Sequence, residues 1–119
     1  MGRCRIASAD VVRLPLSDGD FLTVRKELNA GEGLDLEAIP PAQRTLATIQ
    51  AYLVGWSFVG VGGAPLAYSL MQSVEERADV IRNLDTATMD EIVTALSAHI
   101  RANRRSIEEK KTIPELVPA

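Results

Sequence analysis

The spacing of apolar residues changes along this chain, and that change constrains the fold more than any other feature. Near the start, the β-rich residues 11–14 lead into Pro15 and a Ser-Asp-Gly-Asp turn, and residues 21–24 resume the run. Two such runs around Asp-Gly predict a β-hairpin. From Met89 onward, apolar residues recur every three or four positions, as on a helix with one buried face. The chain must therefore combine a sheet with helices.

The hairpin turn carries two acidic residues, Asp18 and Asp20, on either side of a glycine. Tight turns favour these residue types, and the remaining ligands of a calcium loop are missing downstream. Pro15 cannot donate a hydrogen bond within the sheet, so its strand is expected at an edge. Cys4 and His99 are single residues of their kinds and cannot form a zinc cage. We therefore expect a plain turn and no metal site.

The middle of the chain predicts a connector, one helix and a short strand pair. Residues 29–41 lose the apolar pattern and are interpreted as a connector with one anchoring turn. A helix is expected from Pro41, since proline is favoured in the first turn, and it should end before Gly55. Residues 56–59 and 66–68 are interpreted as short strands joined by a glycine-rich turn. Because no helix begins at that turn, a phosphate-binding loop is disfavoured.

The C-terminal third predicts two helices. The sequences Ser-Val-Glu-Glu at 73–76 and Thr-Met-Asp-Glu at 88–91 both match the capping box, in which a hydroxyl and a carboxylate satisfy free backbone amides. The first helix should stop near Asn83. The second should run from about residue 89 to 111, and Pro114 should close it.

Together these elements predict a single α+β domain over residues 9–111. It comprises an N-terminal β-hairpin and a short strand pair packed with about three α-helices, the C-terminal helix being the longest. Residues 1–8 and 112–119 are expected to be flexible termini. The longest apolar stretch, residues 51–67, is broken by glycines and a proline, so neither a membrane span nor a membrane partner is expected.

Reactive side chains are scarce, with one His and one Cys among 119 residues. His99 borders the apolar stripe of the long helix, and neither Ser97 nor Ser106 lies three or four residues from it. The acidic residues fall in caps and turns, where structural roles account for them. We therefore expect no catalytic residue and no cofactor, and a binding protein rather than an enzyme.

The formal net charge of −3 hides an uneven distribution. Residues 73–91 carry six acids against two arginines, whereas residues 99–111 carry five bases against two glutamates. The helix dipole accounts for acid at the start of a helix and base at its end, and a contact surface is the alternative. The chain is mildly acidic and its basic helix end lacks interleaved aromatics, which argues against nucleic-acid binding.

Three stretches, taken in order, resemble the tail assembly chaperones of long-tailed bacteriophages. Residues 21–32 read Phe-Leu-Thr-Val-Arg-Lys-Glu-Leu-Asn-Ala-Gly-Glu, and residues 51–58 read Ala-Tyr-Leu-Val-Gly-Trp-Ser-Phe before a glycine turn. The third stretch leads from Asn-Leu-Asp at 83–85 to Glu-Glu-Lys-Lys at 108–111. The similarity spans about residues 10–111. Two features differ from the family pattern: glycine and valine replace acids after Trp56, and the segment after residue 32, often a longer helix, is short.

The resemblance implies a non-enzymatic assembly factor in the cytoplasm of the bacterial host. Such a protein binds the tape-measure protein and keeps it soluble until the tail-tube protein, a further candidate partner, polymerises around it. The candidate partner contacts are Trp56, Phe58, His99, Arg101, Arg104 and Arg105. For Trp56, a role as core anchor is the favoured alternative.

Two other functions stay open. One is a structural virion protein of the head–tail connector or tail. The other is a small nucleic-acid-binding regulator that uses the basic helix end. The alanine-rich long helix also predicts self-association into a homo-oligomer.

Overall fold

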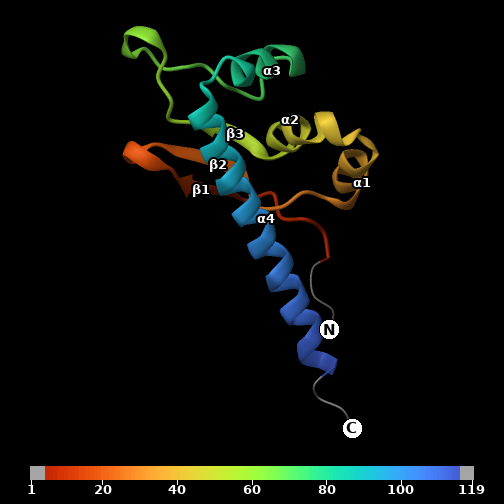
Figure 1. Cartoon of the computed structure of the whole chain (residues 1–119). Coiled ribbons are helices and arrows are strands. Elements are labelled where there is room, and N and C mark those ends of the chain that lie inside the picture. Colours follow the sequence, from red (N-terminus) through yellow and green to blue (C-terminus); the bar gives the residue numbers. More distant parts are fainter. Residues whose placement is uncertain (1–4, 116–119) are drawn as a thin grey trace.

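The computed structural model describes residues 5–115, with side chains described up to residue 104. Its elements are arranged around one sheet (Figure 1). In chain order they are β1 (Val11–Pro15), β2 (Phe21–Arg25), α1 (Ala30–Ala38), α2 (Pro41–Tyr52), β3 (Leu53–Trp56), α3 (Val74–Arg82) and α4 (Thr86–Glu115). Single turns of 3-10 helix, η1 (Ser17–Gly19) and η2 (Val61–Gly63), lie in two of the loops. The α+β class and the longest helix at the C-terminal end are confirmed.

The predicted hairpin is confirmed. β1 pairs antiparallel with β2, with Leu14 opposite Leu22, and Asp18 and Gly19 adopt positive φ angles of 58° and 78° in the turn. The sheet order is β1-β2-β3, so β1 is an edge strand, as the position of Pro15 predicts.

The third strand differs from the prediction in both position and pairing. It begins at Leu53, directly after α2, and pairs with β2 instead of forming a separate pair with residues 66–68. The predicted helix included Leu53. In the structure α2 ends at Tyr52, and Leu53 is buried as the first residue of β3, with 1% exposure. Of the expected strand pair, only an isolated bridge between Val59 and Pro65 forms.

Residues 30–38 form helix α1, where a connector was expected. The Asn29 side chain accepts a hydrogen bond from the Glu32 backbone N–H at 2.9 Å, and Glu32 Oε1 accepts one from the Asn29 backbone N–H at 3.1 Å. This is a reciprocal capping box. Glu32 also pairs with Arg25 of β2. α1 has no buried residue, which explains why apolar periodicity gives no sign of it.

The two C-terminal helices begin at caps, one of which was predicted. Ser73 Oγ accepts a hydrogen bond from the Glu76 backbone N–H at 3.1 Å, as expected at the start of α3. α4 begins earlier than predicted because Asp85, and not Thr88, caps it: Asp85 Oδ1 accepts from the Thr88 backbone N–H at 2.7 Å. The bounds of α4 include Pro114, which was expected to end the helix.

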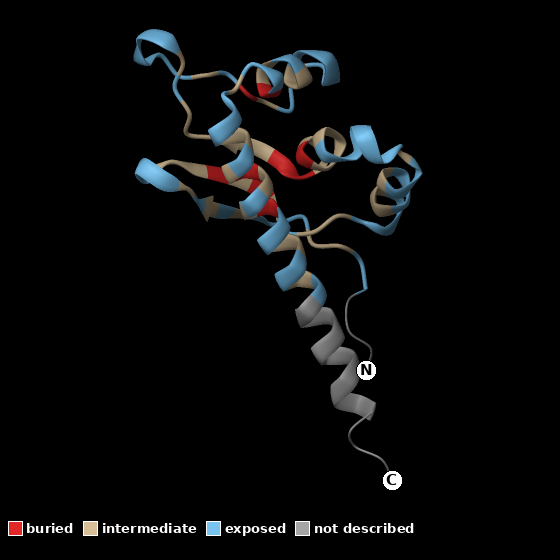
Figure 2. Ribbon diagram, viewed as in Figure 1, coloured by how far each residue is buried: buried red, intermediate tan, exposed pale blue. Residues whose placement is uncertain are grey.

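The core lies between one face of the sheet and helices α2, α3 and α4 (Figure 2). α4 crosses the sheet (Figure 1) and contributes Ile92 and Leu96, which are 0% and 2% exposed. Both belong to the apolar stripe predicted for the long helix. The buried apolar residues are Leu22, Val24, Ile49, Tyr52, Leu53, Tyr68, Ile81, Ile92 and Leu96.

Hydrogen bonds hold α4 at both ends of the hairpin. Glu91 Oε1 accepts from the Ser17 backbone N–H at 3.0 Å beside the turn. At the open end, Asn103 Nδ2 donates to the Lys26 carbonyl oxygen. Beyond this point α4 projects away from the body of the molecule (Figure 1).

Candidate functional site

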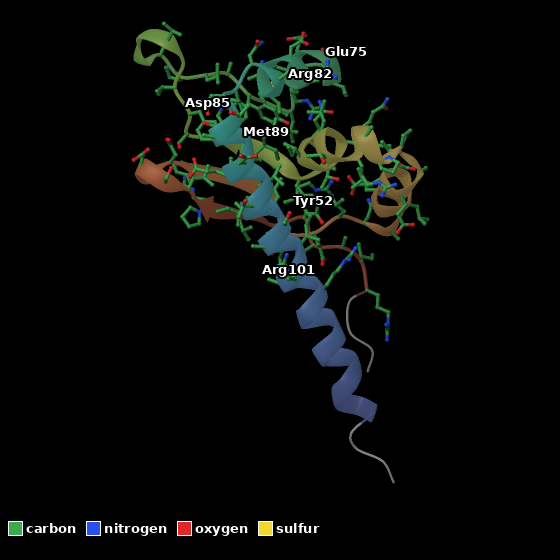
Figure 3. All side chains as sticks on the ribbon, in the orientation of Figure 1. Tyr52, Glu75, Arg82, Asp85, Met89 and Arg101 are labelled. Atoms are coloured by element: carbon green, nitrogen blue, oxygen red, sulfur yellow. The ribbon has the colours of Figure 1, made fainter. Side chains whose placement is uncertain are left out.

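The predicted contact residues fall into two groups with different surroundings. Trp56 and Phe58 lie at and just after the end of β3. His99, Arg101 and Arg104 lie on the second half of α4, and Arg101 is labelled there in Figure 3. Among the described residues, no hydrogen bond or ring contact joins the two groups. The side chain of Arg105 lies outside the described residues.

Trp56 anchors the glycine-rich loop to the sheet. Its Nε1–H donates to the Leu66 carbonyl oxygen at 2.8 Å. Its ring centroid lies 4.9 Å from that of Phe58 and 4.7 Å from that of Tyr68. These contacts use both the apolar ring and the polar N–H within the domain. The geometry therefore agrees with the core-anchor role.

Tyr68 is the buried member of this aromatic group, and sequence reasoning did not single it out. Burial raises the pKa of its phenol, and the nearby Arg77 charge partly offsets that effect. The Tyr68 hydroxyl and Arg77 Nε are buried without a hydrogen-bond partner in the described part of the chain.

His99 occupies the packing edge between α4 and β2. Its Nε2 lies 3.1 Å from the Arg25 carbonyl oxygen, and Nε2 donates there when it carries the proton. The His99 ring meets Tyr52 edge-on, with centroids 6.0 Å apart. Burial raises the pKa of Tyr52. Like Asn103, His99 positions α4 on the open end of the hairpin.

Arg101 and Arg104 are both exposed. Among the described side chains, the only ion pair is the one between Arg25 and Glu32, so no described acid pairs with Arg101 or Arg104. They form the surface-exposed part of the predicted contact set.

A second exposed surface was missed by sequence reasoning. Between β3 and α3, large apolar side chains face outward: Val61 and Met71 are 105% and 97% exposed, and Leu70 and Val74 are each 57% exposed. A large apolar side chain this exposed is available for contact with another molecule. We call Val59, Val61, Leu70, Met71 and Val74 the exposed apolar segment. The sequence could have indicated this segment, because its large apolar residues lie near glycines and follow neither the alternation of a strand nor the spacing of a helix.

A trough runs along α2. One part, of about 280 Å³, lies between α2 and α4, and its walls include Thr48, Val93 and Ile100. An adjoining part, of about 560 Å³, is walled by Leu46, Met89 and other residues of α2 and its neighbours. Thr45 and Ile49 line both parts, so the two depressions flank the same side chains of α2, and we call the pair the trough. Figure 3 labels Met89 and Arg82 near its second part.

The chemistry of the trough suits binding by contact. Its walls are mainly aliphatic and include threonines, and the lining residues also include Arg44 and Arg82. Arg44 is held there by hydrogen bonds to the carbonyl oxygens of Glu37 and Ile39 at 3.3 and 2.9 Å. Among the described residues, no group of three or more His, Cys, Asp or Glu side chains is placed to hold a metal ion. Apolar grooves of this kind accept amphipathic helices through residues spaced three and four apart.

Comparisons with known proteins complete this description. In the part of the chain that the structure describes, no helix is both long and apolar enough to cross a membrane. No family model matches the chain, and no curated protein or solved structure is significantly similar to it.

Proposed function

We propose that this protein is a tail assembly chaperone that binds the tape-measure protein of a long-tailed bacteriophage in the host cytoplasm. The observation that carries the proposal is the apolar surface that the fold leaves uncovered, namely the trough along α2 and the exposed apolar segment. The order of the three resembling stretches supplies the identity of the partner. Neither surface needs a reactive group for this role.

The proposed mechanism is the reversible covering of apolar helix faces. A long tape-measure protein exposes amphipathic segments until the tube forms around it, and exposed apolar surface drives aggregation. A segment with anchors at i, i+3 and i+7 would place them along α2, between Thr48 and the facing Val93 and Ile100 of α4. Because such contacts are released without chemistry, tail-tube protein could replace the chaperone.

Co-expression tests the proposal directly. The tape-measure protein encoded beside this chain should be recovered in the soluble fraction with the wild type, and the two should co-purify. Thr48→Arg, which places a long charged side chain in the trough, should lower the soluble yield. The matched control Glu37→Arg adds the same side chain on exposed α1 and should leave the yield unchanged. An unchanged yield without co-purification in the wild type would rule out the chaperone.

The alternatives give different outcomes. Mass spectrometry of purified particles should not detect a chaperone, whereas a connector or tail subunit would be present in fixed copy number. A nucleic-acid-binding regulator would shift DNA in a salt-sensitive way, and replacing Arg101, Arg104 and Arg105 would abolish that shift.

A further inference from the structure

The two helices that form the α2–α4 part of the trough carry no acidic residue where they flank it. The whole chain has 16 acids against 13 bases, so acids are not scarce overall. Yet α2, residues 41–52, includes no Asp or Glu, and α4 includes none between Glu91 and Glu108. Among the described residues that line this part of the trough, the one charged side chain is Arg44. The surface is therefore apolar and positive in a chain whose net charge is negative.

Arg44 is held beside this part of the trough with much of its guanidinium group unused. Its Nη2 donates to the carbonyl oxygens of Glu37 and Ile39 at the C-terminal end of α1, and these two bonds do not use the N–H groups of Nε and Nη1. The exposed carboxylate of Glu37 forms no ion pair with Arg44 in the described part of the chain. An arginine that is already positioned loses less conformational entropy when it binds a carboxylate.

Arg101 adds a second positive charge on the α4 side. Ser97 lines the trough, and Arg101 follows it by four residues on the same helix face and is exposed. Figure 3 labels Arg101 on α4. The α4 wall also contains the aliphatic side chains of Val93 and Ile100. An occupant of the trough therefore meets an arginine beside aliphatic side chains on each of the two helices.

Helix dipoles do not account for these charges. They favour acids in the first turn of a helix and bases in its last turn. α2 has no acid in its first turn and carries Arg44 as its fourth residue. Arg101 precedes the end of α4 at Glu115 by fourteen residues, which places it well before the last turn. Arg44 does satisfy carbonyl groups of α1, but that role gives no reason for α2 to lack acids.

We propose that this part of the trough selects amphipathic helices that carry acidic residues beside their apolar anchors, and that Arg44 and Arg101 are the selecting residues. The inference rests on the proposed function in one respect, namely that the selected helix would be a segment of the tape-measure protein. Its apolar anchors would cover Thr48, Val93 and Ile100, and its flanking carboxylates would accept hydrogen bonds from the arginines. Lysines at the flanking positions would be repelled, so the same arginines would also exclude basic helices.

The proposal is restricted to one part of the trough and to one class of partner. Arg82 lines the other part, but Asp79 and Asp85 lie three residues from it on either side, so we assign it no selectivity. Nucleic acid is the other polyanion that arginines could attract. It is disfavoured because, among the described residues, no aromatic side chain lines the α2–α4 part for bases to stack on.

Binding of designed peptides to the full chain tests the inference. Each peptide is an amphipathic helix of about 20 residues with Leu at i, i+3 and i+7, and its flanking positions hold Glu, Gln or Lys. Fluorescence anisotropy should give a dissociation constant about tenfold lower for the Glu peptide than for the Gln peptide. The Lys peptide should bind more weakly than the Gln peptide. Added salt should reduce these differences, because it screens exposed charges.

Substitution of the arginines should locate the selectivity. Arg101→Glu breaks no described hydrogen bond and should weaken binding of the Glu peptide by about tenfold, while binding of the Gln peptide changes by less than about twofold. Arg44→Glu should do the same, and the double variant should prefer the Lys peptide. The matched control Arg13→Glu makes the same charge change on β1, where Arg13 is exposed and stacks over Phe21. It should keep the wild-type preference, and circular dichroism should show that every variant is folded.

Several results would overturn the inference. They are equal affinity for the Glu and Gln peptides, no binding of either peptide, or an unchanged preference in the folded Arg44→Glu and Arg101→Glu proteins. Single-stranded DNA that displaces the Glu peptide more effectively than unlabelled Glu peptide would also overturn it. These results are separate from those of co-expression. If the Glu preference holds but the tape-measure protein stays insoluble, the chaperone function fails and the selectivity stands. If the tape-measure protein becomes soluble but the peptides show no preference, only the selectivity fails.

Discussion

Glu32 should control how often helix α1 opens, and its two interactions can be separated by two substitutions. Its Oε1 accepts from the Asn29 backbone N–H at 3.1 Å, which completes the capping box. The same carboxylate forms a two-point ion pair with Arg25, with Arg25 Nη2 2.8 Å from Oε1. Glu32→Gln keeps an oxygen for the cap but removes the charge. Glu32→Ala removes both interactions.

The expected magnitudes follow from the exposure of these groups. The Arg25 and Glu32 side chains are 30% and 34% exposed, so their ion pair is assigned the surface range of about 0.2–1 kcal/mol. The hydrogen bond to the cap contributes about 0.5–1.5 kcal/mol. Glu32→Gln should therefore cost about 0.2–1 kcal/mol, and Glu32→Ala about 1–2 kcal/mol. An Arg25→Ala/Glu32→Ala cycle should show coupling of about 0.5 kcal/mol.

Amide hydrogen exchange is the appropriate assay because α1 has no buried residue and can open without global unfolding. In Glu32→Ala, protection of the α1 amides should fall about 5- to 30-fold, while amides of the sheet change little. Glu32→Gln should give a smaller loss. Equal losses for Gln and Ala, or no coupling to Arg25, would refute the assignment of two separate interactions to Glu32.

Three further predictions concern pH, the core and the aromatic group. Arg25 holds the pKa of Glu32 below its ordinary value of 4.5. The protection of the α1 amides from hydrogen exchange should therefore be complete above that pH, and it should be lost as the pH falls through the lower pKa of the folded state. Arg25→Ala should weaken this pH dependence. Ile92→Ala, at a fully buried site, should lower the free energy of unfolding in urea by about 2–5 kcal/mol. The exposed control Met71→Ala should change it by no more than about 0.5 kcal/mol. Trp56→Phe should cost about 1–3 kcal/mol in the same assay, because the Leu66 carbonyl oxygen loses its donor; an unchanged value would count against the anchor role.

The sequence predicts those parts of the fold that depend on the residue types of a turn or on a repeating pattern of buried apolar residues. The turn at Asp18 and Gly19 requires positive φ angles, which few residue types adopt readily. Ile92 and Leu96 repeat at helical spacing because they face the core. α1 is different. Its stability rests on a cap at Asn29 and an ion pair to another element, and neither leaves an apolar period. β3 was misplaced because Leu53 fits a helical stripe and a strand equally well.

The candidate site was only partly accessible from sequence for a related reason. Arginines on a predicted helix face can be expected to be exposed, as Arg101 and Arg104 are. The trough along α2 depends on how three helices pack, which no single segment encodes. The exposure of Met71 depends on the absence of a covering element, and only the assembled fold reveals it.

The hydrogen bonds between α4 and the hairpin have a consequence for the timing of folding during synthesis. The contacts of Ser17, Arg25 and Lys26 with α4 join residues 74, 74 and 77 positions apart. The apolar face of the hairpin is therefore made early by the ribosome but stays uncovered until most of the chain has been translated. Contacts this distant in sequence slow folding and leave apolar surface open to aggregation in the interval. A nascent chain of this protein would itself need protection until α4 has been made.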